Sequence, residues 1–254
     1  MTADGVGAVV QRARAFVDAH GDALQRARAA VLAGEPAHDA VESQLGDCAD
    51  PRGALRALAV LDALRVRRGR AVERAAAVLA AAQQPDGSWR LGDEADEAAA
   101  IATTAAVAGL LAKTPCVRLT VLDAAAAWLA ARWGPERAQG GDVRLIGGYA
   151  GFFANFDHEL SDPALQWCGR ELERGFRSGA LDALAVARVF AFCDARGLPG
   201  AQLDASEVVL SLLASQGADG GFAPALPETQ RIEATLDALA ALGRLAPARE
   251  PLGR

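Results

Sequence analysis

The sequence has little of what builds β-sheets or binds nucleic acid. Tyr149 is its only tyrosine, threonine and asparagine are scarce, and Lys113 is the one lysine among 26 basic residues. Alanine, leucine and arginine dominate instead, and these residues lose little conformational freedom in a helix. The net charge is −6 and no stretch is strongly basic. We therefore expect a helical protein that binds neither nucleic acid nor an anionic membrane surface.

Signals for export and for membrane insertion are also missing. The N-terminal stretch MTADGVGAVV lacks the basic start and the long apolar core of a signal peptide. The 15 residues between Glu97 and Lys113 carry no charge, but roughly 20 are needed to span a bilayer. The cysteines lie far apart in the sequence and suggest no disulfide framework. These absences predict a cytoplasmic protein without a membrane span.

No familiar catalytic or cofactor-binding motif occurs. The sequence has no Ser-His-Asp elbow, no glycine loop that cradles phosphate and no dinucleotide-binding fingerprint, so no cofactor is expected. His38, His158 and the Asp47-Cys48 pair do not match the spacing of zinc ligands, so no metal site is expected. The cysteines are better explained as small apolar core residues: Cys48, Cys116, Cys168 and Cys193.

Helical patterns fill almost the whole chain. A long amphipathic segment from Val6 to about Leu32 precedes a break at Gly34 and Pro36. The later segments group in pairs, at 37–46 with 53–66, 70–83 with 95–112, 118–132 with 145–157, 163–176 with 180–195, and 204–215 with 228–244. The chain has 254 residues, 52% of them hydrophobic, which can fill a sizeable core. We predict one all-α domain over 1–254, with a flexible tail at 246–254.

Two loops of one design interrupt this helical pattern. The stretch QQPDGSW begins at Gln83 and QGADGGF begins at Gln216, an offset of 216 minus 83, or 133 residues. An apolar helix precedes each loop, and a second helix with a threonine near its start, Thr104 or Thr235, follows. A weaker third copy is DAAAAWLAARWGPERAQGG. The repetition predicts helical hairpins of about 40 to 50 residues that bury their apolar faces against their neighbours.

The loop pattern Q-x-x-D-G-S-W after an apolar helix resembles the QW motif of squalene–hopene and oxidosqualene cyclases. The resemblance covers about 70–112 and 204–244. It implies an α/α toroid, a ring of five or six helical hairpins, with the helix at 1–34 packed outside the ring or completing it. It also implies that the loop residues act as braces rather than in catalysis: Gln83, Asp86, Gly87, Trp89, Gln216, Asp219, Gly220 and Phe222.

The same resemblance implies acid chemistry. Class II terpene cyclases protonate an alkene or epoxide with the middle aspartate of a D-x-D-D motif, which this chain lacks. Its nearest approach, Glu94-Ala95-Asp96-Glu97, places Asp96 in the middle position, although an acidic helix start explains these residues equally. Glu233 takes that position in RIEATLDAL, where a surface ion pair with Arg231 is the alternative. We rank Asp96 first and Glu233 second as the acid.

The segment IGGYAGFFANFDHELSD gathers most of the aromatic residues of the middle of the chain. In a toroid, inner aromatic rings can line the cavity and stabilise positive charge, although at helical spacing they also suit a core. The substrate-binding candidates are Tyr149, Phe152, Phe153, Phe156 and Trp167. His158, between Asp157 and Glu159, is either an accessory base or a surface residue at a helix end.

Two functions from different classes fit these features. One is a terpene-cyclase-like cyclase or isomerase that acts on an apolar polyene by acid-initiated cyclisation in a central cavity. The other is a non-catalytic toroid that binds a hydrophobic ligand or a protein partner, and the sequence leaves a homo-oligomer open. A wide apolar cavity with a buried carboxyl group favours the enzyme, whereas a filled centre with an exposed apolar patch favours the binding protein.

Overall fold

The computed structural model describes residues 3–45, 48–92, 94, 96–138 and 142–246. Within these ranges the protein consists of helices and their connections, and no strand is present. The all-α prediction is therefore confirmed for the described residues. The tail predicted at 246–254 lies outside them, apart from its first residue.

The helices begin and end close to the predicted segments. In chain order they are α1 (Ala3–His20), α2 (Ala23–Leu32), α3 (His38–Leu45), α4 (Pro51–Ala63), α5 (Arg70–Ala81), α6 (Glu97–Ala112), α7 (Leu119–Ala130), α8 (Pro135–Ala138), α9 (Val143–Phe153), α10 (Ser161–Ser178), α11 (Ala183–Cys193), α12 (Ala205–Ala214) and α13 (Glu228–Leu245). The segments of the five predicted pairs correspond to α3 and α4, α5 and α6, α7 and α9, α10 and α11, and α12 and α13, so their helical character is confirmed. As predicted, α10 packs on α11 and α12 on α13, whereas α4 packs on α5, and α6 packs on α7 and α9. The four-residue helix α8 was not predicted.

Two boundaries differ from the prediction for local reasons. The single helix expected from Val6 to Leu32 is wrong, because a break at Gly21 and Asp22 divides it into α1 and α2. The Asp22 side chain accepts from the Gln25 N–H at 2.8 Å, and the Gln25 side chain accepts from the Asp22 N–H at 2.9 Å, which starts a new helix.

Helix α9 ends at Phe153 rather than at residue 157. The Asn155 side chain donates to the Gly151 carbonyl at 2.8 Å and so takes the place of the backbone N–H that continues a helix.

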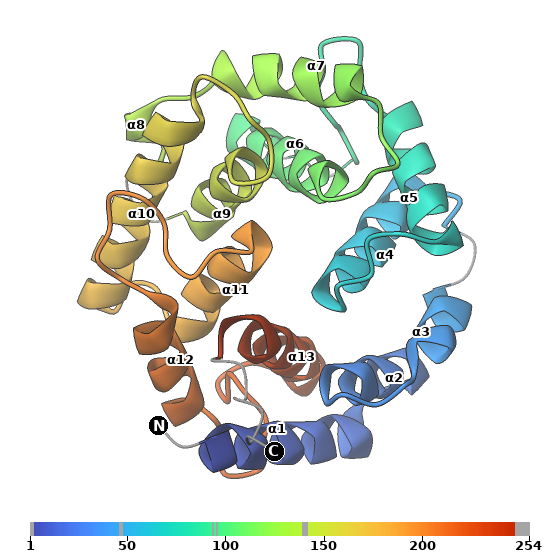
Figure 1. Ribbon diagram of the computed structural model, residues 1–254, viewed down its shortest axis with the longest axis vertical. Helices are drawn as coiled ribbons and strands as arrows, with labels where there is room; N and C mark the ends of the chain where they lie inside the picture. Colours follow the sequence, from blue (N-terminus) through green and yellow to red (C-terminus); the bar gives the residue numbers. More distant parts are fainter. Residues whose placement is uncertain (1–2, 46–47, 93, 95, 139–141, 247–254) are drawn as a thin grey trace, which may run out of the picture.

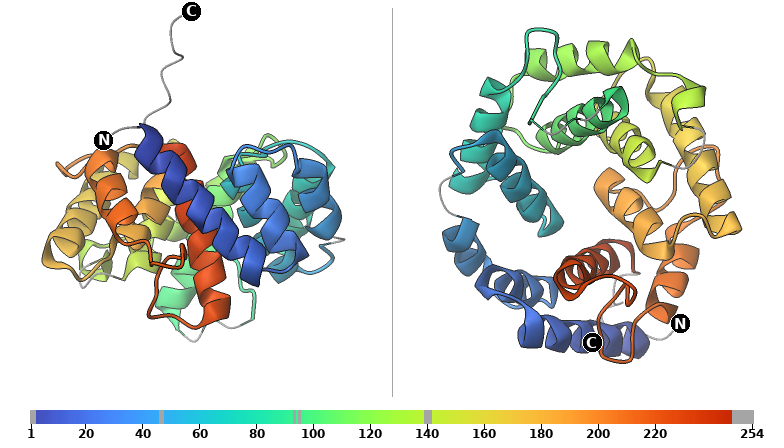
Figure 2. Two further views of the ribbon diagram at one scale, coloured as in Figure 1. Left: turned by 90° about the horizontal axis from the view of Figure 1, so that it is seen from below. Right: turned by 180° about the vertical axis from the view of Figure 1, so that it is seen from behind.

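The helices run around a common centre in two layers (Figures 1 and 2). Helices α1, α5, α7, α10 and α12 lie on the outside, and α4, α6, α9, α11 and α13 lie toward the centre. The first helix, α1, packs against α13 and α2, so the beginning of the chain lies beside its last helix. Successive helices therefore alternate between the outer and the inner layer over most of the chain.

The sequence explains which helices lie in each layer. Helix α6 has no charged residue between Glu97 and Lys113 and buries most of its length, as expected of a helix that is covered on all sides. Helix α10 is amphipathic, with Cys168 and Leu172 buried and Arg170 exposed, as expected of an outer helix.

Aspartates fix the start of most inner helices. At each of these positions the carboxylate accepts a hydrogen bond from a backbone N–H in the first turn of the helix, which satisfies a donor that has no partner within the helix. These aspartates are Asp50 before α4, Asp96 before α6, Asp142 before α9, and Asp182 before α11.

Candidate functional site

The first QW-like loop joins three helices. Gln83, just after α5, donates through Nε2 to the Gly87 carbonyl at 3.0 Å and to the Val121 carbonyl of α7 at 2.9 Å. The Trp89 N–H donates to Thr104 Oγ1 of α6 at 3.1 Å, and the Trp89 ring is fully buried. The loop thus fixes α5, α6 and α7 relative to one another.

The second loop makes the same contacts. Gln216 donates through Nε2 to the Gly220 carbonyl and to the Val9 carbonyl of α1, both at 2.9 Å. The Phe222 N–H donates to Thr235 Oγ1 of α13 at 2.9 Å, and Phe222 is buried. These hydrogen bonds confirm that the loop residues act as braces, and α1 takes at the second loop the place that α7 takes at the first.

The inner helices line a central cavity that is open to solvent. Its main part has a volume of about 780 Å³ and is lined by residues of α4, α6, α9 and α11 and of the loop before α6. A part of about 390 Å³ continues from it and shares Leu55, Ala106, Arg188 and Phe192. A third part, of about 590 Å³, lies between α2, α4 and α13. The main part alone falls within the range of about 300–1,000 Å³ that is typical of small-molecule sites.

Small side chains keep this centre open. On α6 the residues that face the main cavity include Ala99, Ala102 and Ala106, which recur at the spacing of one helix face. On α9 they include Gly147 and Gly148. A Cβ atom on Gly148 would lie 3.0 Å from the Ala105 Cβ, so glycine there also lets α9 pack closely on α6.

Helix α13 presents a charged stripe to the cavity. Glu233, Asp237, Ala240 and Arg244 recur at intervals of three or four residues and therefore share one face. Asp237 Oδ2 lies 2.7 Å from Arg188 Nη2 of α11. Burial raises the pKa of Asp237 although Arg188 opposes this shift. Asp237 thus lies in the cavity wall with 36% of its side chain exposed, and its pKa lies above that of an ordinary aspartate.

Four arginines of the inner helices line the main part of the cavity, and two of them, Arg52 and Arg144, lie in the first turns of α4 and α9. Arg52 and Arg56 belong to α4, Arg144 to α9 and Arg188 to α11. Glu94 is the acidic residue that lines this part, and its carboxylate accepts from the backbone N–H groups of Leu91 and Gly92 at 2.8 and 3.0 Å. Although burial opposes it, these hydrogen bonds lower the pKa of Glu94, which therefore stays ionised.

A buried ion network lies where the inner helices end. Lys113, just after α6, lies 3.1 Å from Asp62 Oδ2 of α4 and 3.1 Å from Asp194 Oδ2, just after α11. Arg244 near the end of α13 lies 3.2 Å from Asp62 Oδ2 and 3.1 Å from Asp194 Oδ1. The Lys113 side chain is only 1% exposed. The network therefore joins the C-terminal ends of four inner helices, and Asp62 and Arg244 extend it to the wall of the cavity.

Asp96, the first-ranked acid, lies outside the cavity. It is exposed, and its Oδ1 accepts from the Ala99 N–H at 2.8 Å as the N-cap of α6. Its neighbour Ala95 is outside the described residues. The observed contact is the one expected of an acidic helix start, the alternative that the sequence left open.

Glu233, the second-ranked acid, lines the part of the cavity next to α2. Its carboxylate accepts from Gln25 Nε2 at 2.8 Å and pairs with Arg28 Nη1 at 2.8 Å. Arg28 is buried, so its guanidinium has this carboxylate as a charged partner within the protein. The partner is thus Arg28 rather than Arg231, which pairs with Asp219 at 2.8 Å.

His158 lies in the connection between α9 and α10, away from the cavity. Its Nδ1 accepts from the Leu160 N–H at 3.1 Å, and its ring centre lies 5.8 Å from that of Phe153. Asp157 and Glu159 on either side are exposed. The structure therefore brings none of Asp96, Glu233 and His158 together.

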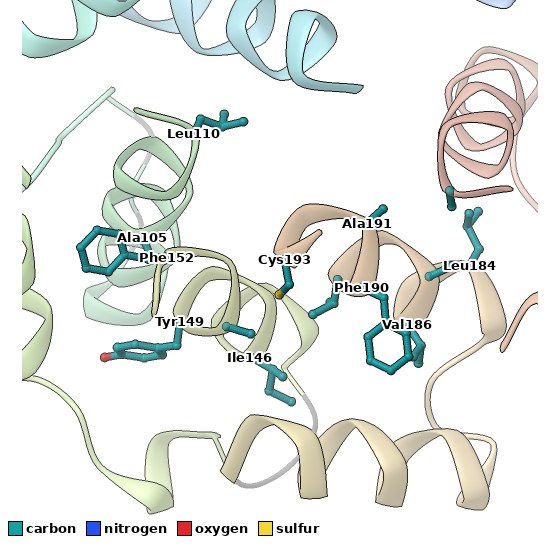
Figure 3. Close-up of a cluster of buried hydrophobic side chains, with 14 of the residues drawn as sticks. Ala105, Leu110, Ile146, Tyr149, Phe152, Leu184, Val186, Phe190, Ala191 and Cys193 are labelled. Carbon is teal, nitrogen blue, oxygen red and sulfur yellow. The ribbon is translucent and has the colours of Figure 1, made fainter. Parts of the chain in front are cut away.

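The aromatic candidates belong to the core between the layers. Tyr149, Phe152 and Phe153 are at most 2% exposed, and Tyr149 donates from its hydroxyl to the Arg132 carbonyl at 3.2 Å. In Figure 3, Tyr149 and Phe152 lie on one side of α9, while α11 lies on its other side. The α9 residues that line the main cavity are instead Val143, Arg144, Gly147 and Gly148. The expectation that these aromatic rings line the cavity is corrected, because the helix turns them toward the outer layer.

The other two aromatic candidates also lie outside the cavity lining. Phe156 is half-buried and stacks on Phe152, with ring centres 5.1 Å apart. Trp167 is on the outer helix α10, where the Arg170 guanidinium lies 5.5 Å from its ring centre. Among the described residues that line the three cavity parts, Phe192 is the aromatic one.

The cysteines are all free thiols. Cys168 and Cys193 are buried, and burial raises the pKa of Cys168 to about 12. Cys48 and Cys116 are half-buried. Within the described ranges, no three His, Cys, Asp or Glu side chains are grouped so that they could hold a metal ion. Cys168 and Cys193 therefore behave as apolar side chains, since burial raises the pKa of both thiols.

The comparisons with known proteins give no relative for this chain. No family model, no curated protein and no solved structure matches it. None of the described helices combines the length and the apolar character that crossing a bilayer requires. The site must therefore be interpreted from its own geometry.

Sequence reasoning missed Asp237 and Arg188, the charged pair within the cavity. A signal was present, because Glu233, Asp237 and Arg244 recur on one face of an otherwise apolar helix. Charged residues on a buried face need a partner or a polar cavity, so this stripe marked the face of α13 that is not packed against the core.

Proposed function

We propose that the protein is an α/α toroid related to the QW-repeat cyclases, and that it acts on an apolar, isoprenoid-like polyene in the central cavity as a cyclase or isomerase. Asp237, rather than Asp96 or Glu233, is the acid in this proposal. The observation that carries it is a carboxyl group with a raised pKa in the wall of a largely apolar cavity.

Acid-initiated isomerisation needs a protonated carboxyl group aimed at the substrate from a water-poor wall. Burial raises the pKa of Asp237, which brings it closer to the first requirement than an ordinary aspartate. Ala240, Ala106 and Phe192 line the same part of the cavity and give Asp237 apolar neighbours, which supports the second. Asp96 is exposed and Glu233 is paired with buried Arg28, so both are poorer donors.

The reaction is balanced without a cofactor. The Asp237 hydroxyl gives its proton to one carbon of a double bond, and the π electrons form the new C–H bond. A cation remains on the other carbon, where a second double bond of the polyene can attack it to close a ring. The final cation loses a proton to the Asp237 carboxylate, which restores the acid. Phe192 presents a π-system to the same cavity and can stabilise the cation.

The second candidate is a protein that binds an apolar molecule without changing it. The observation that favours it is the ion pair of Asp237 with Arg188, since a neighbouring guanidinium stabilises the carboxylate and opposes proton donation. Both candidates place the molecule in the same cavity, and they differ in whether it leaves unchanged.

Two measurements test the proposal. Mass spectrometry of molecules captured by protein from its own host identifies the class of occupant. The purified protein is then incubated with linear polyenes of increasing length, and the products are separated by gas chromatography with mass detection. We expect an isomer of unchanged mass from wild type and none from Asp237→Asn. An apolar molecule that is captured but always recovered unchanged supports the binding protein and overturns the enzyme.

Asp96→Asn and Glu233→Gln serve as matched controls, because each also removes one carboxylate with little change in shape. Both variants should retain product formation if Asp237 is the acid. Loss of product in Asp96→Asn, with the helix content unchanged by circular dichroism, contradicts the assignment to Asp237.

A further inference from the structure

The main part of the cavity has a local excess of positive charge. Four arginines line it, Arg52, Arg56, Arg144 and Arg188, against the single acid Glu94. The chain as a whole has a net charge of −6, so the positive charge of this part of the cavity is opposite in sign to that of the whole protein. Arg52 and Arg144 are each the second residue of an inner helix, α4 and α9, which places them at the same end of the cavity.

The acids nearby leave part of this charge without a partner. Arg188 pairs with Asp237 at 2.7 Å, and Arg144 pairs with Asp142 at 3.0 Å. Glu94 directs its oxygens to the N–H groups of its own loop. Arg52 donates from Nε to the Leu91 carbonyl. Arg56 is exposed and forms no hydrogen bond or ion pair with the described residues, although its charge helps to lower the pKa of Asp50.

An apolar wall begins directly beside these arginines. Leu55 on α4, Ala102 and Ala106 on α6, and Val189 and Phe192 on α11 line the same part of the cavity. Leu55, Ala106 and Phe192 also line the part that continues toward the ends of the inner helices. One end of the cavity is therefore basic. The part that continues inward from it is mainly apolar, with Asp62, Asp237 and Arg244 as charged residues in its wall.

We propose that the central cavity binds an elongated molecule with an anionic head group, a carboxylate or a phosphate, at Arg52, Arg56 and Arg144, and with an apolar tail that lies along α6. This inference rests on the proposed function and names the class of its substrate. Arginine suits such a head group because its planar guanidinium donates two parallel hydrogen bonds to carboxylate or phosphate oxygens. An uncharged apolar molecule would instead cover the Arg56 guanidinium without offering it a partner, which is costly.

Calorimetric titration of the full chain tests the head group. The probes are dodecanoate, dodecyl phosphate and uncharged dodecanol, each at low ionic strength and below the concentration at which it forms micelles. We expect at least one anionic probe to bind about tenfold more tightly than dodecanol. Salt should weaken this preference. The more tightly bound anion identifies the head group as carboxylate or phosphate.

Variants locate the effect. Arg56→Gln should lower the affinity for the anionic probe about tenfold and leave that for dodecanol unchanged. Arg170→Gln on the outer helix α10 removes the same charge from an exposed position and should change neither affinity. Circular dichroism of each variant checks that the helices remain folded.

The outcomes separate this inference from the proposed function. Equal affinities of wild type for all three probes overturn the anionic head group but leave an apolar substrate in the cavity. An unchanged preference in the double variant Arg56→Gln, Arg144→Gln also overturns the head-group site. Failure of all three probes to bind wild type removes both proposals.

Discussion

Gln216 and Val9 lie 207 residues apart and are joined by a hydrogen bond of 2.9 Å from the Gln216 side chain to the Val9 carbonyl. Gln83 makes the same bond to Val121 of α7, the next outer helix along the chain. After α12 the described chain has no further outer helix, and α1 from the other end of the chain takes that place. The same contact therefore joins the end of α12 to α1 and the end of α5 to α7.

Gln216→Ala should loosen α1 selectively. The change removes the hydrogen bonds of the Gln216 side chain to the Val9 and Gly220 carbonyls and from Arg12, and should lower the free energy of unfolding by about 1–2 kcal/mol. Hydrogen exchange should increase mainly in α1, because the rest of the structure keeps its contacts. Gln230→Ala, an exposed glutamine in α13, is the control. Equal exchange of α1 in the two variants would show that Gln216 does not hold the first helix.

Gly220→Ala should be more harmful than an ordinary replacement of a left-handed glycine. Gly220 has φ of +88°, and a Cβ atom there would lie 2.4 Å from the Arg12 carbonyl oxygen of α1. Gly34 has φ of +94° but nothing within 4 Å of its Cβ position, so Gly34→Ala measures backbone strain alone. We expect about 1 kcal/mol of destabilisation for Gly34→Ala and roughly 1–3 kcal/mol more for Gly220→Ala in urea unfolding. Equal losses would contradict close packing of the loop on α1.

The helices could be predicted because their signals are local. Breaks such as Thr114-Pro115 and caps such as Asp204 act over a few residues and can be recognised without a structure. The break at Gly21 and Asp22 was missed because the apolar pattern continues across it. The capping pair of Asp22 with Gln25 is also local, and it outweighs the periodicity.

The network around Lys113 should make stability depend on pH in acid. Although burial opposes it, Lys113 and Arg244 lower the pKa of Asp194. A carboxyl group whose pKa is lowered by folding stabilises the folded state at pH values above its ordinary pKa, near 3.8. This stabilisation is lost as the pH falls through the pKa of the folded state. Wild type should therefore lose stability on acidification below about pH 4.

Asp194→Asn tests this contribution. Asparagine also tolerates the left-handed conformation of Asp194, which has φ of +52°, so the change removes mainly the charge. The free energy of unfolding at pH 7 should fall by roughly 1–3 kcal/mol, since the buried Lys113 loses one of its two carboxylates. The difference from wild type should shrink as the pH falls. Asp39→Asn, at an exposed position of α3, is the control, and a difference that stays constant with pH would exclude the ion network as its cause.

The cavity could not be predicted because it depends on contacts between distant helices. Whether α9 turns Tyr149 or Gly148 toward the centre depends on its rotation against α6, and both faces of α9 are apolar. The positions of the aromatic residues in the sequence therefore could not show which residues of α9 line the cavity. Asp237 and Arg188 come from different hairpins, and their 2.7 Å contact follows only from the packing of α13 on α11.

Asp237 should titrate above an ordinary aspartate and control both stability and turnover. Burial raises its pKa against the influence of Arg188. A group whose pKa is raised by folding contributes stability that is fully present at pH values below its pKa in the unfolded state, near 3.8. This contribution is lost as the pH rises through the pKa of the folded state. Relative to Asp237→Asn, wild type should therefore become less stable as the pH rises through this window. Carbon-detected NMR of the carboxyl group measures the titration directly.

The acid role of Asp237 then predicts a particular pH profile. Product formation by wild type should fall as the pH rises through the pKa of Asp237, because only the protonated carboxyl group can donate. Arg188→Gln removes the positive charge that holds the pKa of Asp237 down, so product formation should fall only at a higher pH than in wild type. Arg170→Gln leaves the cavity unchanged and should keep the wild-type profile. Two outcomes would remove Asp237 from the reaction and leave a protein that binds without catalysis. One is an NMR titration in which the pKa of Asp237 is at or below that of an ordinary aspartate. The other is a pH dependence of product formation that is the same in Arg188→Gln as in wild type.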